Sequence, residues 1–454
     1  MRIWKTLRSV RAGFPGGWEK YATGIDGENS PPFVQPENPD DRRSLIPAHG
    51  LPEYWYPALP DKAVGKAKPV ALKLLNKRLV FFRGKDGKVA ALDDSCPHRG
   101  AYLSWGNCFW HGYVSCPYHG ATFDENGECV EFITEGPQSK MVGAKGMRAR
   151  VFPTRTLKGV VFVWMGENAP APIEEDVPPE FFDRESMVQT AWRYWDLNWM
   201  IALENTGDAH NMFYVHRNSF RMLRNRLGGR PRTPIGYRVE IVNNKSVKRL
   251  REGSGGANEA FYAGPDGKLP YQLYHPRVNG KWPKHRVRLL WAWFFDWMDG
   301  TKKRRSRFKN PSDWEGQRLP GMVRNNHHTH MYTRWGVPVD KDLTRVVYFF
   351  TSRPRNVFGR LYDRLTFNIG LNWMIHFNFS DQDYDAMRSC RYELPEYLSS
   401  TDNPVIGLRK LVTEHARGIR RTVDVLEETS AERAAREADE VLRAAQTGHR
   451  ANGS

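Results

Sequence analysis

Two short segments of the sequence combine cysteine and histidine at a spacing that suits a metal centre. Cys96 and His98 form a C-x-H motif, and Cys116 and His119 form a C-x-x-H motif, with seventeen residues between the two motifs. In each segment a proline follows the cysteine and a glycine lies within two residues of the histidine, and both residue types favour tight turns. We therefore expect two hairpin tips that clasp one centre from opposite sides, each supplying one ligand of each kind.

This ligand set is typical of a Rieske [2Fe–2S] centre, in which two thiolates bind one iron and two imidazoles bind the other. The alternative is a zinc site with two cysteine and two histidine ligands. Zinc fingers usually pair cysteine with cysteine and histidine with histidine, whereas the order here alternates, so the sequence predicts a Rieske cluster. The other cysteines do not match the ligand spacing and are expected to be small buried side chains: Cys108, Cys129 and Cys390.

A second group of candidate residues lies further along the chain. Asn205, Asp208, His210 and His216 fall within a stretch of twelve residues. Together with the two cysteine-histidine motifs, this stretch resembles the pattern of the Rieske non-haem iron oxygenases across roughly residues 51–390. The likeness is to the terminal oxygenase, or alpha, component of the homotrimeric type.

The resemblance implies that His210, His216 and a downstream carboxylate bind Fe(II). Two imidazoles and one carboxylate on one face of the ion leave open positions where O2 and substrate can meet. Asp383 is the preferred carboxylate, because apolar residues follow it three and four positions later, as the family pattern has them. Asp381 and Asp385 remain alternatives.

The chain departs from the family pattern at the first histidine. His210 lies two residues after Asp208 where the family has three, and Asn211 occupies the position of the family's ligand. Either the helix is locally distorted or His210 reaches the metal from an unusual position. In the alternative, His210 is a histidine of the core or one that lies beside the site. His216 fits one common version of the family pattern in either case.

Asp208 and Asn205 are candidate catalytic residues that do not bind iron. In the resembling family the aspartate bridges a Rieske histidine of one subunit to an iron-binding histidine of its neighbour, which implies a ring-shaped homo-oligomer, here a homotrimer. A carboxylate that accepts the second N–H of each imidazole fixes both rings. The alternative is that Asp208 caps or supports a helix.

The resemblance implies a terminal oxygenase that receives electrons through the Rieske cluster and uses O2 at Fe(II). It would hydroxylate or oxidatively demethylate an organic, ring-containing substrate, as in aromatic compound catabolism. A cis-dihydroxylating aromatic dioxygenase is one alternative, and a Rieske electron carrier with an inactive mononuclear site is another. No G-x-G-x-x-G fingerprint opens a βαβ unit, so NAD(P)H is expected to act only through a ferredoxin, a ferredoxin reductase or both.

Composition limits the class of protein but does not name a function. The chain has 454 residues, of which 40% are hydrophobic, so two well-packed domains are expected. Its net charge of +17 suits several kinds of acidic partner, and without a supporting motif no nucleic-acid partner is expected. We interpret the basic run at 302–309 as a solvated loop and the histidines of 327–330 as structural or pocket-lining. No apolar run is long enough to span a bilayer, and the cysteine content suits a reducing compartment, so we expect a cytoplasmic protein.

We expect an α+β architecture with an N-terminal arm at 1–50, an all-β Rieske [2Fe–2S] domain at 51–168, a catalytic domain at 169–428 and a helical or polar tail at 429–454. The resemblance implies a helix-grip, START-like catalytic domain, in which an antiparallel sheet wraps around a long helix. Apolar runs between turn residues predict strands at Val70–Leu75, Leu79–Phe82, Val89–Leu92, Ala121–Phe123, Val130–Phe132, Gly159–Met165, Leu289–Phe295, His328–Val337 and Thr344–Thr351. Helices are predicted around Leu197–His216 and from Leu408 to Leu426.

Overall fold

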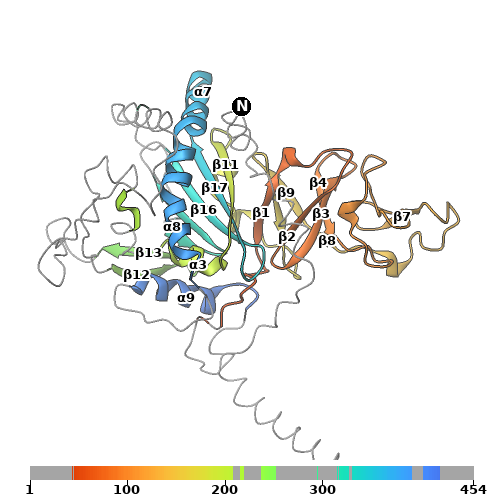
Figure 1. The fold of residues 1–454 in the computed structure, drawn as a ribbon, viewed down its shortest axis with the longest axis horizontal. Helices are drawn as coiled ribbons and strands as arrows, with labels where there is room; N and C mark the ends of the chain where they lie inside the picture. Colours follow the sequence, from red (N-terminus) through yellow and green to blue (C-terminus); the bar gives the residue numbers. More distant parts are fainter. Residues whose placement is uncertain are drawn as a thin grey trace, which may run out of the picture.

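The computed structural model describes residues 43, 45–207, 215–218, 237–251, 294, 314, 316–326, 330–390 and 402–419. Within these residues the chain forms four antiparallel sheets, three small ones before residue 165 and one of seven strands after residue 186. Figure 1 shows the two groups side by side, with the small sheets on the right and the large sheet next to a long helix. The α+β architecture and the sheet-rich catalytic domain are confirmed.

Short strands joined by tight turns build the first half of the chain. They are β1 (Trp55–Pro60), β2 (Val70–Leu74), β3 (Lys77–Arg83), β4 (Val89–Asp93), β5 (Val114–Ser115), β6 (Ala121–Phe123), β7 (Cys129–Phe132), β8 (Val151–Phe152), β9 (Thr154–Leu157) and β10 (Val160–Trp164). The sheets have the strand orders β1-β10-β9, β2-β3-β4-β8 and β5-β6-β7. All six strands that the sequence predicts here are present, and the turn between β3 and β4 is closed by Asp86, whose carboxylate accepts a hydrogen bond from the N–H of Lys88 (2.8 Å).

The large sheet has the strand order β11-β17-β16-β15-β14-β13-β12. Its strands are β11 (Met187–Trp195), β12 (Tyr237–Val242), β13 (Ser246–Arg251), β14 (Gly316–Arg318), β15 (Met322–Asn326), β16 (Met331–Pro338) and β17 (Thr344–Ser352). The strand predicted from His328 is confirmed from Met331 onward, while residues 327–329 lie outside the described part of the chain. The predicted strand at 289–295 lies outside it too, except for Phe294.

Strand β17 explains why the sheet has partners on both faces. All nine of its residues are buried, and its apolar side chains alternate between two separate hydrophobic clusters. Val347 and Phe349 pack with the domain that contains β1 and β10, whereas Val346, Tyr348 and Phe350 pack with the helices that follow β17. Alternation along a strand sends neighbouring side chains to opposite faces, so the sheet lies between the first domain and the long helix.

The long helix begins at Asn356, whose side chain accepts a hydrogen bond from the N–H of Gly359 (2.8 Å). The helix comprises α7 (Val357–Thr366), the π-helical segments η9 (Phe367–Leu371) and η10 (Trp373–Ser380), and α8 (Asp381–Met387). It crosses the face of the sheet near β16 and β17 (Figure 1). This arrangement is the helix-grip fold, and π-helical turns of this kind occur frequently at functional sites.

Two shorter helices complete the second half, α3 (Trp199–Glu204) and α9 (Asn403–His415). The predicted helix around 197–216 is confirmed at α3 only, and residues 208–214 lie outside the described part of the chain. The prediction that the last helix continues to Leu426 is wrong, because α9 ends where Ala416 is extended, with ψ 141°. The next residue, Arg417, donates to the carbonyl of Glu53 in the first domain (2.8 Å) and pairs with Asp176, and these contacts hold the chain away from the helix axis.

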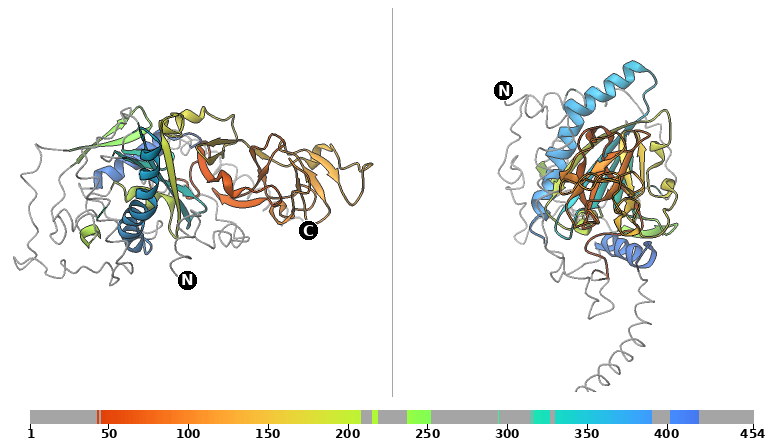
Figure 2. Two further views of the ribbon diagram at one scale, coloured as in Figure 1. Left: turned by 90° about the horizontal axis from the view of Figure 1, so that it is seen from above. Right: turned by 90° about the vertical axis from the view of Figure 1, so that its right-hand side faces the viewer.

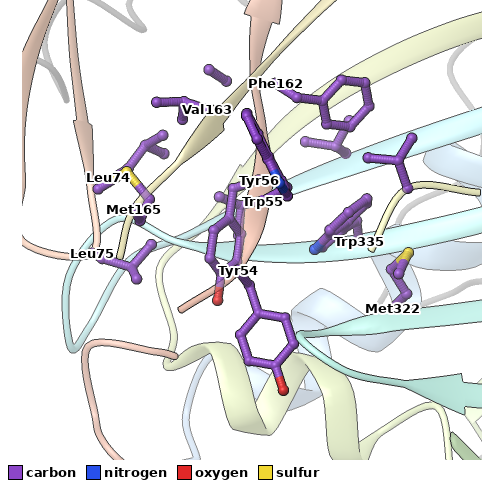
Figure 3. Packing of buried hydrophobic residues seen from close by; sticks show 14 of the residues in the cluster. Tyr54, Trp55, Tyr56, Leu74, Leu75, Phe162, Val163, Met165, Met322 and Trp335 are labelled. Atoms are coloured by element: carbon purple, nitrogen blue, oxygen red, sulfur yellow. The ribbon is translucent and has the colours of Figure 1, made fainter. Parts of the chain in front are cut away.

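One continuous core joins the two domains, as Figure 3 shows for Tyr56 of β1, Phe162 of β10 and Trp335 of β16. The ring centroids lie 6.4 Å apart for Tyr56 and Trp335 and 6.2 Å apart for Phe162 and Trp335. A buried ion pair between Lys73 and Asp340 (3.3 Å) links the same domains. We keep the division at residues 168 and 169, which falls between β10 and β11, as a proposal. Residues 1–42 and 420–454, including most of the proposed arm and the whole tail, lie outside the described part.

None of the helices in the described residues has the length and apolar character that a membrane crossing requires.

Candidate iron–sulfur and iron sites

The two cysteine-histidine motifs lie in loops that share one backbone hydrogen-bond pattern. In each loop the cysteine N–H donates to the carbonyl five residues later, at 2.9 Å from Cys96 and at 2.8 Å from Cys116. The cysteine carbonyl accepts from a glycine four residues later, and φ is 77° at Gly100 and 73° at Gly120. Glycine adopts this left-handed conformation without steric cost. The first loop follows β4 and the second joins β5 to β6, so two matching hairpin tips face one another.

These tips bring thiol to thiol and imidazole to imidazole. A hydrogen bond from the Cys96 thiol lowers the pKa of Cys116 to about 6 and raises the pKa of Cys96. The rings of His98 and His119 meet edge to face with centroids 4.8 Å apart. Nδ1 of His119 is buried without a hydrogen-bond partner among the described residues, which is costly unless another group binds it. A thiolate pair beside an imidazole pair fits the two irons of a Rieske cluster.

The thiol side of this site is buried, whereas the imidazole side faces outward. Cys96 and Cys116 belong to the hydrophobic core of the small sheets, while His98 and His119 are half-buried. The exposed ring of Tyr118 stacks on His119 with centroids 3.7 Å apart. The left view of Figure 2 shows the segment with β5, β6 and β7, in orange, at the end of the first domain farthest from the large sheet, so the imidazole side is accessible to an electron donor.

A second site is formed by His216, in the 3-10 turn η6 (Val215–Asn218), and Asp383 of α8. The distance from Nε2 of His216 to Oδ1 of Asp383 is 2.9 Å, and both side chains are buried. Two donors bound about 2.1 Å from one divalent ion at a right angle would lie about 3.0 Å apart, so the pair fits two ligands of one ion. His210, the third predicted ligand, lies outside the described residues, and within them no third His, Cys, Asp or Glu side chain completes a metal site with His216 and Asp383.

Neighbouring side chains fix the orientation of His216. Its Nδ1 lies 3.0 Å from Oε1 of Gln382, and the ring of Phe379 stacks on the imidazole with centroids 3.5 Å apart. An amide oxygen only accepts hydrogen bonds, so Nδ1 carries the proton in this arrangement and Nε2 presents its lone pair to Asp383. Two lone pairs that face each other in a buried site attract a cation between them.

Asn205 and Arg334 also contact the Asp383 carboxylate. Nδ2 of Asn205 donates to Oδ1 of Asp383 at 3.2 Å. Arg334 of β16 donates to Oδ1 of Asn205 at 3.1 Å and to the carbonyl of Ala202 at 2.9 Å, and its Nη1 lies 3.7 Å from Oδ2 of Asp383. These contacts tie α3, β16 and α8 together at the carboxylate.

The structure brings Asp383 to His216 rather than either alternative carboxylate. Asp381 and Asp385 lie two residues to each side on the same helix, and residues two apart do not share a helix face. Burial raises the pKa of Asp381, which the positive charge of Arg193 opposes. Asp208, the expected bridge between subunits, lies outside the described residues.

The other residues that the sequence singled out divide between described and undescribed segments. The histidines at 327–329 and the basic run at 302–309 lie outside the described residues. His330 is buried with its ring centroid 5.3 Å from that of Phe350.

Two of the three cysteines outside the motifs behave approximately as expected, since Cys129 is buried and Cys108 is half-buried. The expectation is wrong for Cys390, which is exposed just after α8 because the chain leaves the helix there.

Sequence reasoning missed Arg334, Gln382 and Phe379. A signal existed for Arg334, because a charged residue inside an otherwise buried strand needs a partner of opposite charge. Gln382 and Phe379 flank the candidate carboxylate, but their spacing alone does not indicate contact with a histidine 166 residues away from Gln382.

Comparison with known proteins assigns two consecutive segments of the chain separately. A family model described as the Rieske [2Fe-2S] domain matches residues 54–145. A second model, described as the homotrimeric ring hydroxylase, matches residues 164–260.

Relatives extend the match over most of the chain. The chain is 28% identical over 391 residues to the terminal oxygenase component CarAa of carbazole 1,9a-dioxygenase from Sphingomonas sp, covering 82% of this chain and 93% of the relative. It is 34% identical over 170 residues to the oxygenase component of dicamba O-demethylase from Stenotrophomonas maltophilia, covering 36% of this chain and 47% of the relative. A solved structure of the reduced complex between oxygenase and ferredoxin in carbazole 1,9a-dioxygenase has a similar fold, with a TM-score of 0.59 at 22% identity, covering 84% of this chain and 92% of that one.

Along the chain, the matched [2Fe–2S] domain precedes the matched ring-hydroxylase domain. The match to the terminal oxygenase component of carbazole 1,9a-dioxygenase extends over 93% of that relative. The chain belongs to the Rieske non-haem iron oxygenases, as a terminal oxygenase component that uses a [2Fe–2S] cluster and a mononuclear iron.

Proposed function

We propose that this terminal oxygenase inserts oxygen from O2 into an organic, ring-containing substrate by hydroxylation or oxidative demethylation, with His210, His216 and Asp383 holding its Fe(II). The observation that carries the proposal is the buried pair of His216 and Asp383, whose donor atoms lie 2.9 Å apart. A buried imidazole and carboxylate from distant parts of the chain match two members of a facial triad. His210 remains the proposed third member.

Fe(II) bound at these residues would supply the position at which O2 is activated. The surrounding side chains hold the ligands in place before any substrate binds. Gln382 accepts a hydrogen bond from Nδ1 of His216, and Phe379 stacks on the imidazole face. Asn205 orients the carboxylate of Asp383. Partners that orient metal ligands in this way tune the metal and keep its geometry fixed.

Four ligands are proposed for the cluster, Cys96 and Cys116 for one iron and His98 and His119 for the other. The paired geometry of the two loops and the buried, unpartnered Nδ1 of His119 support this division. Asp208 is proposed to carry electrons from this cluster to the iron of a neighbouring subunit, which requires a homotrimer of the kind named in the matching family.

Electron supply is proposed to come from a ferredoxin, a ferredoxin reductase or both. The complex of a structurally similar oxygenase with ferredoxin supports such a partner. The half-buried imidazoles of His98 and His119 offer the docking point nearest to an iron. A cytoplasmic location, where such donors are reduced, stays part of the proposal.

The substrate class and the reaction are taken from the named relatives. One relative is an O-demethylase of dicamba and another is a dioxygenase of carbazole, and both substrates contain aromatic rings. Because the carbazole relative is named a dioxygenase, cis-dihydroxylation is the second candidate reaction for this chain. Products formed with isotopically labelled O2 distinguish these reactions. Hydroxylation places one labelled atom in the ring product and dihydroxylation places two, whereas O-demethylation leaves the phenol oxygen unlabelled and sends the labelled atom to formaldehyde.

The first test is anaerobic iron analysis with EPR on wild type, His216→Ala and His210→Ala. We expect about three irons per wild-type chain, with a Rieske spectrum after reduction and loss of the mononuclear iron alone in each variant. If His210→Ala keeps all its iron, His210 is not an essential ligand. If wild type binds only the two cluster irons after Fe(II) reconstitution, the proposal fails and the chain is an electron carrier.

A further inference from the structure

Helix α7 presents apolar side chains away from the protein. Val357, Phe358, Leu361 and Leu365 are 77%, 82%, 55% and 45% exposed. At the helical repeat of about 3.6 residues these four positions fall within roughly one quarter to one third of the circumference. Thr366, on the opposite side, is buried. An ordinary surface helix has the reverse pattern, with its apolar stripe on the core, so this stripe has a function outside the described fold.

Positive charge borders the stripe. Arg360 and Arg364 are exposed along one edge of it, and Arg355 is exposed just before the helix begins. No ion pair to any of these three side chains is found in the part of the chain that the structure describes. Asp363 is the only acidic residue in 353–366, and it is half-buried rather than exposed. The helix is therefore basic and amphipathic, with both its apolar and its charged groups directed outward.

The place of α7 in the fold excludes the electron donor as its partner. Figures 1 and 2 show α7 at the free end of the long helix, beyond the edge of the large sheet. The sheet of β5, β6 and β7, which carries the second cluster loop, lies at the right-hand end of the molecule in Figure 1, far from α7. A donor bound to α7 would be too distant to reduce the cluster directly.

The border of the stripe limits the kind of partner. Two α7 helices would not suit each other, because arginines lie beside the stripe of each and like charges repel across a contact. An anionic membrane supplies both requirements at once, since its acyl boundary accepts apolar side chains and its phosphates attract arginine.

We propose that α7 binds the surface of an anionic membrane. Phe358, Leu361 and their apolar neighbours enter the boundary between headgroups and acyl chains, and Arg360 and Arg364 lie at the level of the phosphates. The helix lies along the surface without spanning the bilayer. If the substrate is an apolar ring compound, as the proposed function has it, this contact brings the catalytic domain to the phase in which that substrate concentrates.

The test is sedimentation of the iron-loaded enzyme with lipid vesicles. Wild type is mixed with phosphatidylcholine vesicles containing about one third phosphatidylglycerol, and with pure phosphatidylcholine. We expect binding to the anionic vesicles that weakens with salt. The double substitution Phe358→Glu and Leu361→Glu should reduce it at least about tenfold. Arg360→Gln should reduce it about fivefold.

Ile406 provides a matched control, because it is a 40% exposed apolar residue on α9. Ile406→Glu should bind vesicles like wild type, and an unchanged Rieske spectrum verifies that each variant is folded. The proposal is overturned if wild type ignores anionic vesicles, or if the double variant of α7 binds as well as the control. It is also overturned if the double variant changes the oligomeric state in light scattering, because α7 then contacts a second copy. Iron content is unaffected by any of these outcomes, so the proposed function is tested separately.

Discussion

Arg334 supports the Asp383 carboxylate in two ways, by its positive charge nearby and by its hydrogen bond to Asn205, which in turn donates to Asp383. Replacing Arg334 by methionine keeps much of its volume but removes the charge and the donors to Asn205 and to the carbonyl of Ala202. Asn205 then loses the contact that holds its amide oxygen, and its Nδ2 is no longer aimed at Asp383. The carboxylate keeps its negative charge in a buried site without the nearby guanidinium.

The size of the effect follows from these contacts. Removing one partner of a buried charge pair costs about 3–5 kcal/mol in folding stability. The Nη1 to Oδ2 distance of 3.7 Å is longer than a hydrogen bond. We therefore expect the lower end of the range, about 3 kcal/mol. Mutating residues that orient metal ligands lowers metal affinity about 10–100-fold, and we expect the same loss for Fe(II). Arg334→Lys keeps the charge but not the fork of donors, so it should fall between wild type and the methionine variant.

Two assays measure these effects. Urea unfolding is monitored by tryptophan fluorescence, and Fe(II) affinity is measured by anaerobic titration against a competing chelator. The Rieske EPR signal serves as an internal control, because the cluster loops lie in the other domain and should keep their spectrum. The reasoning is refuted if Arg334→Met binds Fe(II) as tightly as wild type, since Asp383 would then be positioned without Arg334. A loss of both metal centres together would point to general unfolding and would equally contradict a local role.

Two further predictions concern buried carboxylates. Glu204 accepts two hydrogen bonds from Arg409, at 2.7 and 3.0 Å. Arg409→Met should thus destabilise the protein by about 3–5 kcal/mol in urea unfolding, and an additional Glu204→Gln should restore part of that loss; no recovery would show that the charge of Glu204 is not the cause. Burial raises the pKa of Asp176 from 3.8 to about 6, although the positive charge of Arg417 opposes the shift. The pKa of Asp176 is higher in the folded state than in the unfolded state. The stability that Asp176 contributes is therefore present below about pH 3.8 and is lost as the pH rises through about 6. Relative to wild type, Asp176→Asn should gain up to about 3 kcal/mol between pH 4 and pH 7; a stability difference that does not change over this interval would contradict the assignment.

The cluster loops could be predicted from sequence because their structure is local. Each loop closes through hydrogen bonds that span four or five residues, and its glycine has a φ above 70°. Ligand type, spacing and turn residues therefore lie within a few positions of one another. The strands of the first domain could be predicted for the same reason, since short apolar runs between turns determine them.

The iron site is different because its parts meet only after folding. Nothing in the spacing of α8 distinguishes Asp383 from Asp381 or Asp385 by physical reasoning, and the family pattern made the choice. The distinction arises in three dimensions, where the helix turns one carboxylate of the three to His216. Arg334 reaches the same carboxylate from a strand of the large sheet.

Helix ends and outward faces were also decided by tertiary contacts. The helical period after Leu408 predicted a helix to Leu426, yet the pairing of Arg417 with Asp176 competes with further helix and ends α9 at His415. Periodicity reports which residues share a face, but it does not report whether that face meets the core, as α7 demonstrates.

By itself, the sequence determined the ligand set of the cluster, the strands around it and the likeness to an oxygenase, because these depend on residue type and short spacing. The tertiary structure decided which carboxylate faces His216, which arginine supports it and where the last helix ends. These depend on contacts between segments more than a hundred residues apart, as for His216 with Gln382 and Arg334 with Ala202. Such contacts form only when the sheet and the long helix have packed, because packing brings the distant groups within bonding distance and excludes the water that would otherwise solvate them.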